Sequence, residues 1–128
     1  MKPIDLINAD AVDAAIRIHR KLGPGLLESV YEMLLGASLE KQGYRIARQH
    51  PDAVHHDGMH FANAFRVDLL VDDRRVVEIN SVEQLSKAHA EQVLAYLRLL
   101  EQPVGPLVNF SCVTMKEGIK HLVNDYRP

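Results

Sequence analysis

The stretch Phe65-Arg66-Val67-Asp68-Leu69-Leu70-Val71 and the stretch Arg75-Val76-Val77-Glu78-Ile79-Asn80 decide the fold of this chain. Apolar residues alternate along the first stretch and dominate the second, which predicts two β-strands. The residues between them, 72–74, have the composition of a turn, so the strands form a hairpin. Each strand carries one internal acid, Asp68 or Glu78, and a charge inside an apolar strand needs a partner or a function.

The length of the turn decides whether these two acids can cooperate. A three-residue turn over 72–74 pairs Val71 with Arg75. It then places Asp68 opposite Glu78, with their Cβ atoms about 5 Å apart on one face, whereas a two-residue turn separates them onto opposite faces. Two carboxylates so close repel unless a proton or a cation lies between them, and a hard divalent cation fits oxygen ligands. Structural ion pairs with neighbouring arginines remain an equally open interpretation.

The rest of the chain predicts further elements around this hairpin. The expected elements are helices around 12–19 and 27–39, strands over 44–50 and 53–57, a helix over 86–100, a strand over 104–110 and a closing helix over 115–123. The resulting order, ααββββαβα, describes an α/β domain with a mixed β-sheet. At 128 residues, we expect one domain over 1–128.

Composition limits the possible functions. A formal net charge of −2 argues against a broad basic surface for nucleic acid, although it leaves room for a local groove. The single cysteine, Cys112, excludes an intrachain disulfide and fits a reducing compartment. No signal peptide is visible at the N-terminus, and no window approaches the roughly 18 apolar residues of a membrane span. We therefore expect a cytoplasmic protein without a membrane partner.

Several motifs together resemble one nuclease family. Asp68, the short hairpin and Glu78-Ile79-Asn80 resemble the D…(D/E)-x-K signature of the PD-(D/E)XK nuclease superfamily. Gly25-Leu26-Leu27-Glu28-Ser29-Val30-Tyr31 resembles the GxxExxY motif of a small prokaryotic family within that superfamily. The resemblance spans roughly residues 5 to 124. It implies a restriction-endonuclease-like core, a mixed sheet flanked by helices.

The resemblance also implies a metal-dependent active site. It predicts phosphodiester hydrolysis in DNA or RNA with Mg²⁺ or Mn²⁺ as cofactor. The implied metal ligands are Glu28, Asp68, Glu78 and the backbone carbonyl of Ile79. Considered without the resemblance, Glu28 is better explained as an early-helix acid that complements the helix dipole.

A second helical motif resembles the exonuclease-like branch of the superfamily. Gln92-Val93-Leu94-Ala95-Tyr96 matches its QxxxY pattern. The i, i+4 spacing places Gln92 and Tyr96 on one helix face, where an amide and a phenol can orient a phosphate or the catalytic groups. Ordinary helix packing is the alternative interpretation of both residues.

One position departs from the signature. Asn80 stands where the superfamily pattern has a catalytic lysine, and asparagine carries no charge. Losing a preorganised electrostatic donor typically costs on the order of 10²–10³ in rate, so we expect slow or absent hydrolysis. The alternative is an inactive nuclease-like domain that binds nucleic acid or a protein partner, and a purely structural role is a third hypothesis. Lys87 is a candidate replacement for the lysine, although a lysine at a helix start is more often solvated.

Four histidines fall in an expected hairpin or loop. They are His50, His55, His56 and His60. Their spacing does not match a metal motif such as HExxH, so we expect them to be surface residues.

Overall fold

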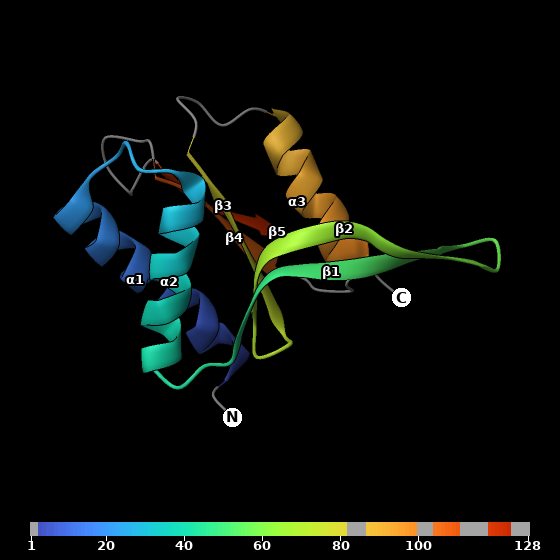
Figure 1. Cartoon of the computed structure of the whole chain (residues 1–128), viewed down its shortest axis with the longest axis horizontal. Coiled ribbons are helices and arrows are strands. Elements are labelled where there is room, and N and C mark those ends of the chain that lie inside the picture. The colour runs from blue at the N-terminus through green and yellow to red at the C-terminus, as the bar shows by residue number, and fades with distance from the viewer. Residues whose placement is uncertain (1–2, 82–86, 100–103, 111–117, 124–128) are drawn as a thin grey trace.

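The computed structural model describes residues 3–81, 87–99, 104–110 and 118–123. Within them a five-stranded mixed sheet has helices on both faces (Figure 1). The elements are α1 (Ile4–Leu22), α2 (Glu28–Lys41), β1 (Ile46–His56), β2 (Met59–Val71), β3 (Arg75–Asn80), α3 (Lys87–Leu99), β4 (Val104–Asn109) and β5 (Ile119–Val123). The predicted fold class, α/β with a mixed sheet flanked by helices, is confirmed.

The strands lie in the sheet in chain order, β1-β2-β3-β4-β5. All neighbours are antiparallel except β3 and β4, which are parallel. Parallel neighbours need a crossover connection, and α3 lies in that connection. None of the helices in the described part of the chain is long and apolar enough to span a membrane.

Two hydrophobic cores sandwich the sheet. On one face α1 and α2 pack through buried residues such as Leu35 against Leu69 and Val77 of the sheet. On the other face Leu97 of α3 packs with a second buried cluster that includes Val76. Successive strand residues point to opposite faces, so Val76 and Val77 serve different cores. Glu78, which lies between Val77 and Ile79 of the first core, therefore leaves the sheet on the α3 side.

The helix boundaries follow local chemistry. Helix α1 begins at Ile4, earlier than predicted, with Pro3 at its N-cap position. Helix α2 ends as expected before Gly43, which has φ 97° and donates its N–H to the Glu40 carbonyl at 2.9 Å. Glycine adopts that left-handed conformation without the steric penalty of a side chain.

The strand character predicted for 44–50 and 53–57 is confirmed, but the predicted break between the two strands is wrong. The expected strands over 44–50 and 53–57 form one continuous β1, and β2 already begins at Met59, so the hairpin is longer than predicted. Its turn is Asp57-Gly58, and both residues have positive φ, as tight two-residue hairpins require. Figure 1 shows this hairpin projecting from the body of the sheet.

The predicted closing helix over 115–123 was also wrong where the structure describes it. Ile119–Val123 forms β5, which pairs antiparallel with β4 from Val104↔Val123 to Val108↔Ile119. Without β5, one side of β4 would present unpaired backbone groups, and this pairing satisfies them. The first part of that predicted helix, residues 115–117, lies outside the described residues.

Candidate active site

The β2–β3 hairpin brings Asp68 and Glu78 together. The strands pair from Val71↔Arg75 to Leu69↔Val77, so the turn has the three-residue length that was predicted to place the acids opposite each other. At the next position of the hairpin, the carboxylates of Asp68 and Glu78 each accept a hydrogen bond from a backbone N–H of the facing strand. Asp68 Oδ2 accepts from the Ile79 N–H at 2.8 Å, and Glu78 Oε1 accepts from the Asp68 N–H at 3.3 Å. The predicted juxtaposition of these two acids on neighbouring antiparallel strands is confirmed.

Glu78 is the buried member of the pair, with only 7% of its surface exposed. Burial raises the pKa of its carboxyl well above the ordinary value, and the negative charge of Asp68 and a hydrogen bond between the two carboxyl groups raise it further. The bond from the Asp68 N–H acts in the opposite direction, and the charge of Glu32 adds a smaller rise. Burial and the neighbouring charge therefore favour the protonated form of Glu78 when no cation is present.

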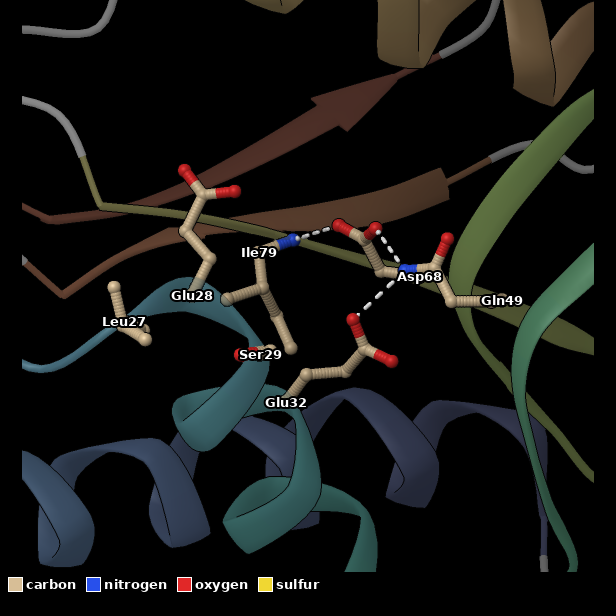
Figure 2. Close-up of a pocket in the computed structure, with 7 residues that line it drawn as sticks. All are labelled: Leu27, Glu28, Ser29, Glu32, Gln49, Asp68 and Ile79. Carbon is tan, nitrogen blue, oxygen red and sulfur yellow. Dashed lines mark hydrogen bonds between the residues drawn. The ribbon is translucent and has the colours of Figure 1, made fainter.

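Asp68 stands between this buried acid and an open pocket of about 460 Å³. Figure 2 shows the pocket, which is lined by Leu27, Glu28, Ser29, Glu32, Gln49, Asp68 and Ile79. The side-chain amide of Gln49 links two of the pocket carboxylates, because its Nε2 donates to Asp68 Oδ1 at 3.1 Å and to Glu32 Oε2 at 2.8 Å. Gln49 has φ 50°, a conformation costly for a non-glycine residue, which persists where the surroundings impose it.

Glu32 is the site residue that sequence reasoning missed. Its residue surface is only 5% exposed, and Arg48 Nε donates to its Oε1 at 3.1 Å. It lies four residues after Glu28, so both acids share one face of α2. That spacing was the available signal. Glu32 adds a second helix-borne carboxylate to the pocket, already compensated by Arg48 and Gln49.

Glu28 begins α2 and is exposed at the rim of the pocket. Its Oε1 accepts from the Ser81 N–H at 2.9 Å, which ties the start of α2 to the end of β3. In Figure 2 it rises from the first turn of α2 beside Ile79. The structure thus brings Glu28 and Asp68 to the same pocket from different elements.

Tyr31 fixes the loop that leads into Glu28. Its hydroxyl donates to the Gly23 carbonyl at 2.6 Å and accepts from the Leu26 N–H at 3.1 Å. Its ring is fully buried and stacks on Phe110 with centroids 4.2 Å apart. Gly25, at φ 111°, supplies a turn that other residues rarely adopt. The GxxExxY spacing is therefore a loop pinned to the core by its tyrosine, with the glutamate at the start of the helix.

Helix α3 presents Tyr96 from the other side. Gln92 Nε2 donates to the Tyr96 hydroxyl at 2.8 Å, and the Tyr96 ring stacks on Phe65 of β2 at 4.7 Å. Burial raises the pKa of Tyr96, the bond from Gln92 lowers it, and the charges of Glu78 and Asp68 raise it. The phenol therefore lies within electrostatic reach of the acid pair and stays protonated at neutral pH.

The chain matches the family model of the PD-(D/E)XK nuclease superfamily over residues 5–122. The chain belongs to the PD-(D/E)XK nuclease superfamily. Neither curated proteins nor solved structures gave a match. The matched range includes Glu28, Asp68, Glu78 and Tyr96, so the pocket lies inside the superfamily domain.

Asn80, which the sequence motif aligns with the superfamily lysine, is the last residue of β3. It is in register with Asn109 of β4, and its carbonyl accepts from the Phe110 N–H at 3.0 Å. Lys87, the candidate replacement for that lysine, lies on the surface of α3. Its side chain is 90% exposed and pairs with Glu91 at 3.7 Å, one turn along α3.

The donor chemistry of the acid pair suits a hard divalent cation. Asp68 and Glu78 offer carboxylate oxygens, and their mutual repulsion is what a cation would relieve. Within the residues that the structure describes, no group of three or more His, Cys, Asp or Glu side chains is arranged to hold a metal. Magnesium takes only one or two carboxylates together with water, so a pair meets its requirement.

Proposed function

We propose that this protein is a metal-dependent nuclease that hydrolyses phosphodiester bonds of DNA or RNA slowly. The observation that carries the proposal is the contact between the Asp68 carboxylate and the buried Glu78 at the edge of an open pocket. An acid pair with one buried member is costly, and one that opens onto a pocket inside a nuclease-superfamily domain is well explained by a cation.

The proposed ligands are Glu28, Asp68, Glu78 and the Ile79 carbonyl, with Mg²⁺ or Mn²⁺ as the cation. When bound, such a cation would lower the pKa of a coordinated water and offset the charge of the phosphate. A bound cation would favour the ionised form of Glu78. Asp68 is already oriented for this role, because the Ile79 N–H and the Gln49 amide hold its two oxygens.

Tyr96 and Gln92 are proposed to orient the substrate. Because the Tyr96 hydroxyl accepts from Gln92, its own hydrogen is not used in that bond. A phenol whose pKa is raised keeps this hydrogen at neutral pH and can donate it to a phosphate oxygen. Asn80 cannot supply the positive charge that lysine brings to this position, which is why we propose slow turnover.

The test is cleavage of end-labelled single- and double-stranded oligonucleotides of DNA and RNA with Mg²⁺ or Mn²⁺. We expect slow cleavage by the wild type, none by Asp68→Ala, and a gain of about 10²–10³-fold for Asn80→Lys. Asp73→Ala is the matched control, because this acid lies in the same hairpin and its side chain is 67% exposed. Efficient wild-type cleavage that Lys87→Ala abolishes would show that Lys87 does the work of the missing lysine.

Calorimetry with Mg²⁺ and Mn²⁺ tests the cation separately from turnover. We expect weak binding that Asp68→Ala removes and Asp73→Ala leaves unchanged. A wild-type protein that binds neither cation at millimolar concentrations would overturn the proposed function.

Asn80 favours a second candidate function, a nuclease-like domain that binds nucleic acid or a protein partner without cutting. Glu32 is already satisfied by Arg48 and Gln49, which also suits a pocket that is stable without a cation. The same oligonucleotides distinguish the two functions. Salt-sensitive binding without cleavage, unchanged in Asn80→Lys, would favour the second candidate.

A further inference from the structure

The tip of the β1–β2 hairpin carries a pair of histidines that face each other across the strands. His55 lies directly opposite His60 in the ladder, one pair beyond His56↔Met59, which flanks the Asp57-Gly58 turn. Their Nδ1 atoms are 3.2 Å apart, and their ring centroids are 4.5 Å apart. Both residues are exposed, so water and small solutes reach them.

This spacing matches the separation of two nitrogens bound to one first-row transition metal. At metal–nitrogen distances of about 2.0–2.1 Å, two imidazole nitrogens lie about 2.9 Å apart at a right angle and about 3.3 Å apart at a tetrahedral angle. The observed 3.2 Å falls between these limits. In the free protein a single N–H···N hydrogen bond accounts for the contact, and binding requires that this shared proton leave or move to an Nε2 atom.

We propose that His55 and His60 form a chelating site for a divalent transition metal of the class that prefers imidazole, Zn²⁺, Ni²⁺ or Cu²⁺. Imidazole suits these metals, whereas the carboxylates of the pocket suit Mg²⁺ and Mn²⁺. Water completes the coordination shell, because the pair supplies two ligands. The bound metal links β1 to β2 next to the turn and so stabilises the tip of the hairpin.

The backbone supports this geometry before any metal arrives. Asp57 and Gly58 have φ 49° and 73°, which fits the tight turn favoured in two-residue hairpins and fixes the register that sets His55 against His60. A cross-strand pair placed in this way has Cβ atoms about 4.5–5.5 Å apart. Little reorganisation is then needed beyond rotation of each ring.

The test is a calorimetric titration of untagged protein with ZnSO₄ near pH 7.5, in the Asp68→Ala background so that the acid pocket does not contribute. We expect one Zn²⁺ per chain. His55→Ala and His60→Ala should each weaken binding at least about tenfold, because the second imidazole binds intramolecularly at high effective concentration. His56→Ala is the matched control, since this neighbour is 71% exposed and points to the other face of the hairpin.

Imidazole ¹⁵N NMR supplies an independent readout. On addition of Zn²⁺ the Nδ1 resonances of His55 and His60 should move while those of His56 do not. Equal loss of affinity in His56→Ala, shifts confined to Nε2 atoms, or no Zn²⁺ binding would each overturn the site. Because the titration uses Asp68→Ala, failure here says nothing against the proposed nuclease.

Discussion

The two halves of strand β2 differ in how deeply their side chains are buried. Its inner half is buried against both cores, with Val67, Leu69 and Val71 fully buried. Its outer half, in the projecting hairpin, leaves Met59 50% and Phe61 48% exposed. Asp68 belongs to the inner half, where packing and backbone bonds hold each side chain. His60 belongs to the outer half, where the turn and the partner strand β1, which carries His55, hold the side chains with few contacts.

The difference indicates how each half can serve chemistry. A charge beside the inner half is expensive, as the raised pKa of Glu78 on the neighbouring strand β3 indicates. That cost suits a site whose electrostatics must be fixed in advance. The outer half bears little cost for polar side chains, so it can change residues without unfolding the domain. The following predictions test this contrast.

The largest stability effect is expected at Leu69. Replacing it by alanine leaves a cavity between the sheet and α2, because Leu69 is fully buried in the core that includes Leu35. We expect a loss of about 2–5 kcal/mol in the free energy of unfolding, measured by urea denaturation. A loss below about 1 kcal/mol would mean that the inner half is no more constrained than the tip.

Glu78→Gln should change how stability depends on pH. In the unfolded wild-type chain Glu78 titrates near its ordinary pKa of about 4.3. In the folded state its pKa is raised, chiefly by burial and then by Asp68, so the folded state binds more protons between the two values. Wild-type stability contributed by the protonated form is therefore complete below about pH 4 and is lost as pH rises through the folded pKa.

Glutamine imitates the protonated acid without titrating, so Glu78→Gln should remove this fall and melt higher than wild type at pH 8. Each kcal/mol regained corresponds to about 4 °C in Tm. Added Mg²⁺ should stabilise the wild type at pH 8 but not the variant. Asp73→Asn, an exposed acid in the same hairpin, is the control. If the stability of wild type and of Glu78→Gln changes with pH in the same way, the pKa of Glu78 is not raised in the folded state.

Tyr31→Phe should have an intermediate effect. The variant keeps the ring stacked on Phe110 but loses the hydroxyl bonds to Gly23 and Leu26. We expect a loss of about 1–2 kcal/mol in thermal or urea unfolding, because each bond contributes roughly 0.5–1.5 kcal/mol. Cation affinity measured by calorimetry should also fall, since Glu28 is positioned by this loop.

Tyr44→Phe is the matched control for Tyr31→Phe. Tyr44 is also buried, and its hydroxyl donates to Asp10 at 2.5 Å on α1, away from the pocket residues. It should lose stability without losing cation affinity. If both variants bind the cation like wild type, the loop does not position Glu28.

Site features that depend on residues close together in the chain could be predicted from the sequence, and those that depend on tertiary contacts could not. The pairing of Asp68 with Glu78 depends on a short turn and the two-residue period of a strand, and both can be read along the chain. Glu32 had a helical spacing that pointed to it, but its burial depends on Arg48 and Gln49 of β1. The left-handed backbone of Gln49 has no signal in its residue type.

The fold errors have the same origin. The helix-like spacing within 115–123 predicted a helix, but Ile119–Val123 forms a strand because it pairs antiparallel with β4. In the outer part of β2 the apolar alternation that begins at Met59 breaks at Ala62-Asn63-Ala64, and pairing with β1 makes this stretch a strand. Tertiary pairing overrides weak local preference in both places.

The smallest effect is expected at Phe61 in the outer half of β2. Its side chain is half exposed, and its partner across the ladder is Val54 of β1, so Phe61→Ser removes a partly covered side chain and leaves no enclosed cavity. We expect the free energy of unfolding to fall by about 1 kcal/mol, with cation binding at Asp68 unchanged. Urea denaturation alongside Leu69→Ala compares the two halves of one strand directly. A loss as large as that of Leu69→Ala would show that the projecting hairpin is part of the cooperative core, and the contrast between the halves would then fail.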